Sequence, residues 1–162
     1  MSARGAGAYE KGGILSSINL TVDGKLYQVP AGLTVMEACR KVGIKIPSLC
    51  YHPRLESTGA CRICAIEVDG FRNLQAACVT LVSDGMQIKT HTSRVINARK
   101  MNLALLLSNH PNKCMTCESN GSCEFQDLIY DYGIEEELPK MPHDPGLIDD
   151  SSLAITRDLN KC

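Results

Sequence analysis

All but two of the nine cysteines, together with one histidine, fall into two compact sets whose side chains are metal donors. The first set is Cys50, Cys61, Cys64 and Cys78, and the second set is His110, Cys114, Cys117 and Cys123. Thiolates and imidazoles bind metals, and thiols in a reducing compartment seldom persist as disulfides. The spacing therefore predicts two metal centres, of iron and sulfur, and a protein that carries electrons.

The spacing of the first set favours one of two kinds of metal centre. Ten residues separate Cys50 from Cys61, two separate Cys61 from Cys64, and thirteen separate Cys64 from Cys78. Four thiolates satisfy either a zinc ion or a [2Fe–2S] cluster, so ligand type alone leaves both open. Structural zinc sites usually have two short Cys-x-x-Cys pairs, and this set has one. Gly59 and Ala60, just before Cys61, allow a close approach of the backbone to inorganic sulfide. The pattern favours [2Fe–2S], with zinc as the alternative.

The second set places four donors within fourteen residues, in the spacing His-x3-Cys-x2-Cys-x5-Cys. Pro111, Asn120 and Gly121 interrupt regular structure there, as expected of a loop that wraps a metal centre. One histidine and three cysteines also suit zinc, so a zinc-stabilised interaction module without a redox role remains the alternative function.

The composition restricts the class of protein. The chain has 162 residues, 44% of them hydrophobic, with a formal net charge of −1. Lys and Arg are scattered rather than clustered, which argues against nucleic-acid binding. No apolar run approaches the roughly 18 to 20 residues that span a bilayer, so we expect no direct membrane insertion and a cytoplasmic location. Two Phe and no Trp leave a core of aliphatic residues, which bound clusters would help to stabilise.

Local signals in the first half indicate strands that surround one helix. Asp23-Gly24 is a hairpin turn, and Thr34 with Glu37 forms a capping box at the start of a helix that Gly43 can end. Cys39 lies inside this helix and is read as a buried thiol without a metal. The expected strands are 18–22, 25–29, 65–68, 74–80 and 86–90, and the expected helix is 34–42.

The second half is expected to be helical and then irregular. Thr92 or Ser93 can begin a helix that runs to Ser108, and residues 109–111 interrupt it just before the second set. A short helix follows Cys123 to about Tyr132. Residues 135–152 are acidic and rich in Pro and Gly, which indicates a linker.

The sequence motifs around both sets resemble those of a known family. They are Pro47-Ser48-Leu49-Cys50-Tyr51, Gly59-Ala60-Cys61-Arg62-Ile63-Cys64, Ala77-Cys78-Val79-Thr80, Asn109-His110-Pro111, Cys114-x-x-Cys117 and Gly121-x-Cys123. Together they resemble the N-terminal iron–sulfur region of the large iron–sulfur subunit of complex I, of [FeFe]-hydrogenases and of NAD-linked formate dehydrogenases. The resemblance implies an α+β fold, in which a β-grasp [2Fe–2S] ferredoxin-like domain precedes a small helical domain whose [4Fe–4S] cluster is held by one histidine and three cysteines.

The resemblance also predicts the domain organisation. It implies a [2Fe–2S] domain over residues 16–92 and a His(Cys)3 [4Fe–4S] domain over residues 93–134. Residues 135–162 are then a linker and the start of a truncated ferredoxin domain with two [4Fe–4S] clusters. In that family, a motif similar to Asp158-Leu159-Asn160-Lys161-Cys162 precedes a domain with two [4Fe–4S] clusters. Cys162 is therefore a candidate ligand of a further [4Fe–4S] cluster, and we expect the sequence to be part of a longer chain.

The expected function is a relay for single electrons within a multi-subunit NAD(P)-linked oxidoreductase. The implied partners are a flavin-containing iron–sulfur subunit that oxidises NAD(P)H and a catalytic subunit or domain. The catalytic centre would be of the hydrogenase, formate dehydrogenase or quinone-reductase type, and we favour the first two. No catalytic residue is assigned within this segment. Replacing one thiolate by the neutral imidazole of His110 removes a negative charge from the second cluster, which is expected to raise its reduction potential.

Overall fold

A computed structural model describes residues 17–111, 113–134 and 148–158. Its main element is a five-stranded mixed sheet with the order β2-β1-β5-β3-β4. The central pair β1 and β5 is parallel, and the other neighbouring strands are antiparallel. The strands are β1 (Ser17–Val22), β2 (Lys25–Pro30), β3 (Ala65–Val68), β4 (Gln75–Ala76) and β5 (Met86–Lys89).

The β1–β2 hairpin forms where the sequence predicted it. Asp23 and Gly24 both have positive φ, 49° and 82°, as a two-residue hairpin turn requires. Leu20 and Val22 alternate with more exposed neighbours along β1 and point into the core. The turn therefore fixes the register that buries the apolar face of this strand.

Helix α1 (Val35–Lys41) packs against the sheet and completes the core. The predicted capping box is present, because the Glu37 main-chain N–H donates to Thr34 Oγ1 at 3.3 Å and the Thr34 N–H donates to Glu37 Oε2 at 2.8 Å. Gly43 has a φ of 79°, as predicted for the end of this helix. The core is formed by Leu20, Val22, Val29, Ile66, Val68 and Ile88 of the sheet and by Val35, Met36, Ala38 and Cys39 of α1.

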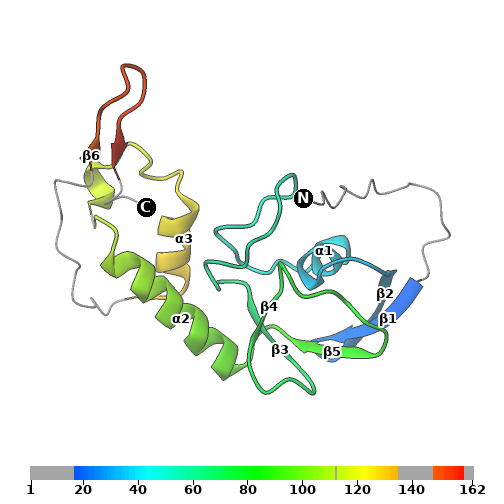
Figure 1. The fold of residues 1–162 in the computed structure, drawn as a ribbon. Helices are drawn as coiled ribbons and strands as arrows, with labels where there is room; N and C mark the ends of the chain where they lie inside the picture. Colours follow the sequence, from blue (N-terminus) through cyan, green and yellow to red (C-terminus); the bar gives the residue numbers. More distant parts are fainter. Residues whose placement is uncertain (1–16, 112, 135–147, 159–162) are drawn as a thin grey trace, which may run out of the picture.

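The second region begins with helix α2 (Ser93–Ser108), whose N-cap is Thr92. Its buried residues are Val95, Arg99, Leu103 and Leu107, which recur every four positions and so lie on one face. The helix contacts β3, and Figure 1 shows it beside the sheet with α3 (Glu124–Asp131) close by. A 3₁₀ turn, η1 (Cys114–Thr116), lies between the two helices.

Two expectations differ from the structure. The strand predicted over residues 74–80 is wrong beyond β4, because the chain turns at residues 77–80 and hydrogen-bonds to α1 instead of a strand. The predicted linker contains a short hairpin that was not anticipated, with β6 (Ile148–Asp149) paired to β7 (Arg157–Asp158). Residues 135–147 of that linker lie outside the described part of the chain. Among the described helices, none is long and apolar enough to cross a membrane.

Candidate metal centres

Cys64 and Cys78 form a buried pair of thiols in the first set. Their Sγ atoms are 3.4 Å apart, and both side chains are almost completely buried. The Ala77 main-chain N–H donates to the Cys64 carbonyl oxygen at 3.1 Å, which joins the two cysteine-bearing segments. Two thiols so placed can bind the same metal ion from the protein interior.

Helix α1 holds the turn that carries Cys78. The first main-chain N–H groups of α1 donate outward, Val35 to the Thr80 carbonyl oxygen at 2.8 Å and Met36 to the Ala77 carbonyl oxygen at 2.9 Å. These N–H groups have no partner within the helix, so the turn satisfies them while the helix fixes the turn. These hydrogen bonds between α1 and the turn explain why residues 77–80 do not continue the strand.

The other two thiols of the first set lie close to this pair. Burial, with the nearby Cys64, Cys50 and Cys61 thiols, raises the pKa of Cys78 to about 12. Burial also raises the pKa of the Cys50 thiol, but hydrogen bonds outweigh it and lower the pKa overall. These come from the backbone and side chain of Cys61, the backbone of Ala60 and the side chain of Thr58. The first set thus forms two pairs, Cys64 with Cys78 inside and Cys50 with Cys61 nearer the surface.

The ligand loop, residues 59–64, has a backbone that most side chains would not tolerate. Gly59 has a φ of 65°, and a Cβ atom there would lie 3.3 Å from Cγ2 of Val79. Arg62 also has a positive φ, 57°, which is uncommon for a residue other than glycine. The loop therefore needs glycine at position 59 and a surrounding structure that holds Arg62 in place.

Helix α2 braces this ligand loop and the start of β3 through two side chains one turn apart. Asn102 Nδ2 donates to the Arg62 carbonyl oxygen at 3.2 Å, and an Arg99 N–H donates to the Ala65 carbonyl oxygen at 2.8 Å. Arg99 also donates to the Tyr132 hydroxyl at 3.1 Å, just beyond α3. Sequence reasoning missed both residues, although Arg99 is a charged residue at an apolar position of the predicted helix.

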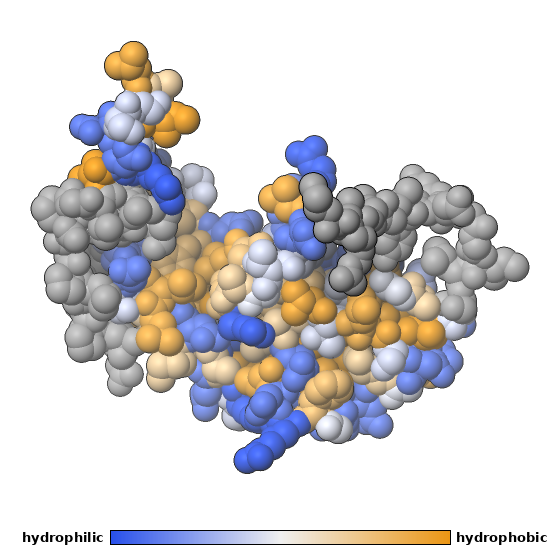
Figure 2. Space-filling view, viewed as in Figure 1, coloured by the Kyte–Doolittle hydropathy of each residue, from blue (hydrophilic) through white to orange (hydrophobic). Residues whose placement is uncertain are grey.

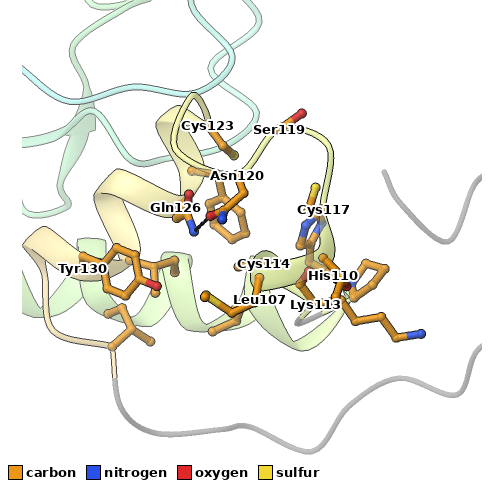
Figure 3. A pocket seen from close by; sticks show the side chains of 16 residues that line it. Leu107, His110, Lys113, Cys114, Cys117, Ser119, Asn120, Cys123, Gln126 and Tyr130 are labelled. Carbon is orange, nitrogen blue, oxygen red and sulfur yellow. Dashed lines mark hydrogen bonds between the residues drawn. The ribbon is translucent and has the colours of Figure 1, made fainter.

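The second set lines one cavity of about 520 Å³ (Figure 3). His110 follows the C-terminus of α2, Cys114 begins η1, Cys117 follows η1, and Cys123 is the N-cap of α3. Leu107, Phe125, Ile129 and Ile134 supply apolar side chains to the same cavity. The His110 ring meets Phe125 edge to face, with 5.4 Å between ring centroids. Each donor therefore comes from an element end, which is how separate segments reach one centre.

Gln126, on α3, fixes the loop between Cys117 and Cys123. Its Oε1 accepts the Gly121 main-chain N–H at 3.0 Å, and its Nε2 donates to Asn120 Oδ1 at 2.9 Å. Its side chain is 8% exposed, so these bonds lie largely out of water. Gln126 was not singled out from the sequence, where a glutamine in an amphipathic helix carries no distinctive signal.

The two sets border a shared hollow of about 380 Å³. Cys61 of the first set and His110 of the second both line it, together with Asn102, Leu105 and Phe125. Over the face seen in Figure 2, apolar and polar side chains alternate without one extensive apolar area. The hollow shows that the two candidate centres are neighbours, joined by α2.

Three further points complete the placement of the predicted site residues. Within the described ranges, no three His, Cys, Asp or Glu side chains gather tightly enough to hold a single metal ion. Cys39 is buried in α1 as predicted, and Cys162 lies outside the described residues.

For the first set, the arrangement in two pairs fits a binuclear cluster, in which each iron takes two cysteines, better than four donors about one zinc ion.

These features define an iron–sulfur protein with two adjacent sites. Residues 16–93 match the family described as 2Fe-2S iron-sulfur cluster binding domain. Residues 99–137 match the NADH-ubiquinone oxidoreductase-G iron-sulfur binding region. The chain therefore contains a [2Fe–2S] domain followed by a [4Fe–4S] region, as the resemblance implied.

Individual relatives agree with this assignment. The chain is 42% identical to the NADP-reducing hydrogenase subunit HndD of Solidesulfovibrio fructosivorans over 91% of its own length and 26% of that protein. It is 44% identical to the NADH-ubiquinone oxidoreductase 75 kDa subunit of Reclinomonas americana, over 72% of the chain and 17% of that protein. A solved structure of an NAD+-reducing [NiFe]-hydrogenase in the H2-reduced state matches with a TM-score of 0.78 and 31% identity, over 91% of this chain and 62% of that one. The chain thus spans about a quarter or less of these two curated relatives.

Proposed function

We propose that the protein relays single electrons between an NAD(P)H-oxidising flavin partner and a catalytic centre. In this proposal Cys50, Cys61, Cys64 and Cys78 hold a [2Fe–2S] cluster. His110, Cys114, Cys117 and Cys123 hold a [4Fe–4S] cluster. The catalytic centre is of the hydrogenase, formate dehydrogenase or quinone-reductase type.

One observation carries the proposal most directly, which is that both donor sets border one hollow. Cys61 and His110 line it from opposite sets, so electrons would cross a short stretch of protein. Helix α2 fixes the separation, because Asn102 holds the ligand loop of the first set and His110 follows the end of the same helix. A rigid spacing is what an electron relay needs from its protein.

The chain's own residues would set the environment of each cluster. An iron–sulfur cluster supplies a store for one electron at a time. The burial of Cys64 and Cys78 keeps water from one side of the first site, whereas Cys50 is exposed on the other. In the second site, Leu107 and Phe125 place apolar side chains along the cavity that His110 also lines. The exposed edge at Cys50 offers a point of approach for a partner.

The partners and the location extend this proposal. Both quoted curated relatives are named as subunits, which supports a role inside an assembly with a flavin-containing iron–sulfur subunit and a catalytic subunit. We further propose that this assembly lies in the cytoplasm. Cys162 is proposed as a ligand of a further [4Fe–4S] cluster.

Ligand substitutions test the proposal. Cys64→Ser and Cys117→Ser are compared with wild type by low-temperature EPR after dithionite reduction, with Cys39→Ser as the control. We expect C64S to lose only the [2Fe–2S] signal, C117S to lose or alter only the [4Fe–4S] signal, and C39S to keep both. Retention of the [2Fe–2S] signal in C64S, or the absence of both signals from anaerobic wild type, would overturn the assignment.

A second experiment addresses the flavin partner. The wild-type protein is mixed with NADH or NADPH, with and without a purified flavin-containing NAD(P)H-oxidising subunit of a related hydrogenase. Bleaching of the cluster absorbance only when the flavoprotein is present supports the relay. Equal bleaching without it would place the site of NAD(P)H oxidation in this chain and contradict the proposal.

A further inference from the structure

Arg99 is a buried charged residue between the two cluster regions. It lies in the middle of α2, on the face that also carries Val95 and Leu103, and its side chain is 1% exposed. Isolated charges are seldom buried to this degree, because removing a charge from water costs several kcal/mol unless it is compensated. Its burial therefore requires a compensating partner.

The described partners of Arg99 are neutral. Its guanidinium donates to the Ala65 carbonyl oxygen at 2.8 Å and to the Tyr132 hydroxyl at 3.1 Å. Its Nε is buried without a hydrogen-bond partner. In the described part of the chain, the ion pairs involve Lys89, His91 and Arg94, and Arg99 pairs with no carboxylate. A guanidinium stays protonated in proteins, so the positive charge persists without a described negative partner.

The first cluster is a candidate for that negative partner. Ala65 directly follows Cys64, and the Cys64 carbonyl oxygen is already bonded to the Ala77 N–H. The Ala65 carbonyl oxygen is free for Arg99, because the pairing of β3 with β5 begins only at Glu67. The guanidinium thus meets the strand one residue from the buried Cys64–Cys78 pair.

We propose that Arg99 supplies the buried positive charge that stabilises the reduced first cluster and raises its reduction potential. This inference rests on the proposed [2Fe–2S] site. Reduction adds one electron, delivered by the flavin partner, to a cluster that four thiolates already make anionic, and no bond is made or broken. A fixed cation nearby favours the more negative, reduced form. Salt screens buried charges poorly, so the effect persists at physiological ionic strength.

A purely structural role is the competing explanation. The bonds of Arg99 to Ala65 and Tyr132 also join the sheet to the segment after α3, and losing them would loosen the interface. The two roles differ in which variants change the potential. Charge compensation depends on the positive charge, whereas an anchoring role depends on the hydrogen bonds.

The test is an EPR-monitored redox titration of the [2Fe–2S] signal in the full chain. Arg99→Gln and Arg99→Met remove the positive charge, whereas Arg99→Lys keeps it. Tyr132→Phe removes one hydrogen bond of Arg99 and leaves the charge in place. Arg94→Gln is the matched control, since Arg94 lies on the same helix but its side chain is 53% exposed. We expect R99Q to lower the ratio of reduced to oxidised cluster at a fixed potential about tenfold, equivalent to ~59 mV for a one-electron couple. R99K, Y132F and R94Q should change this ratio less than about threefold, which is about half of that shift in potential.

Each outcome decides the question. A shift that is confined to both R99Q and R99M supports the proposal, and an unchanged potential in a cluster-bearing R99Q overturns it. An equal shift in Y132F or R94Q also overturns it, because the charge at position 99 is then not the cause. If neither neutral variant retains its cluster, R99K decides: a cluster at the wild-type potential supports charge compensation, and cluster loss or a tenfold drop contradicts it. A wild-type protein without a [2Fe–2S] signal would refute the proposed function instead.

Discussion

The side-chain amide of Asn102 donates a hydrogen bond of 3.2 Å to the main-chain carbonyl oxygen of Arg62. This bond joins α2 to the ligand loop at a residue with a positive φ, between Cys61 and Cys64. The helix that leads to His110 therefore also constrains the first set. The geometry of one centre depends on an element that positions the other.

Asn102→Ala is predicted to make the first cluster more labile. The variant loses a hydrogen bond of about 1 kcal/mol that holds the ligand loop, so iron should be released about fivefold faster to a chelator. The measurement is the decay of cluster absorbance in the presence of excess chelator. Asn97→Ala is the control, because Asn97 is an exposed asparagine on the same helix. Equal rates for both variants would show that the bond to Arg62 has no such role.

Gly59→Ala is predicted to impair assembly of the first cluster. An alanine must adopt a φ of 65° and place its Cβ 3.3 Å from Val79, which adds crowding to about 1 kcal/mol or more of backbone strain. Gly85→Ala is the control, since it has a φ of 74° but open space around its Cβ position. Iron and sulfide content after reconstitution should fall in G59A and stay near wild type in G85A. Similar losses in both variants would leave backbone strain alone as the cause.

Gln126→Ala is predicted to destabilise the second centre selectively. It removes two largely buried hydrogen bonds that fix the loop between Cys117 and Cys123, at a cost of about 2 kcal/mol. The [4Fe–4S] signal should therefore disappear at lower denaturant concentration than in wild type, while the [2Fe–2S] signal disappears at the wild-type concentration. Gln87→Ala, at an exposed position of β5, should change neither. Loss of both signals together would indicate general unfolding.

Cys39 is predicted to react slowly with alkylating agents in the folded protein. Burial, and then the negative charge of Asp23, raise the pKa of its thiol from the ordinary 9.0 to about 11. Only the thiolate reacts, so two pKa units reduce the reactive fraction at pH 8 about a hundredfold, before steric protection. The rate should rise tenfold per pH unit to about pH 11 and level off there. Mass spectrometry of the Cys162→Ser variant measures the alkylation rate of Cys39 at each pH. A plateau in this rate near pH 9 would contradict the prediction.

The direction of this pKa shift also determines how the stability of the folded protein changes with pH. The folded protein keeps the Cys39 proton to about pH 11, whereas the unfolded chain loses it near pH 9. The contribution to stability is therefore complete below pH 9 and is lost as the pH rises from 9 to about 11, by at most about 1.4 kcal/mol per pH unit.

Local sequence signals predicted the elements that depend on neighbouring residues. The Asp23-Gly24 turn and the Thr34–Glu37 capping box both involve residues close in sequence, and both formed as expected. The turn at residues 77–80 could not be predicted in this way, because it depends on N–H groups of α1 more than forty residues earlier. Arg99 was missed for the same reason, since its contacts lie 33 and 34 residues away in sequence.

The donor residues were visible from the sequence, but their arrangement was not. Ligand type alone left zinc and iron–sulfur open for both sets, because cysteine and histidine bind either. The structure adds the division of the first set into a buried and a more exposed pair. It also adds the shared hollow that brings Cys61 and His110 to one surface. These are tertiary relationships between segments that the spacing treats as separate.

The central claim is that the chain carries two different iron–sulfur clusters that exchange electrons with a partner. The most direct test is low-temperature EPR of the anaerobically purified protein, before and after stepwise reduction, combined with iron, zinc and acid-labile sulfide analysis. We predict one [2Fe–2S] and one [4Fe–4S] signal that appear on reduction, with iron and sulfide present in similar amounts. A colourless, EPR-silent protein that contains zinc and no sulfide would contradict the account.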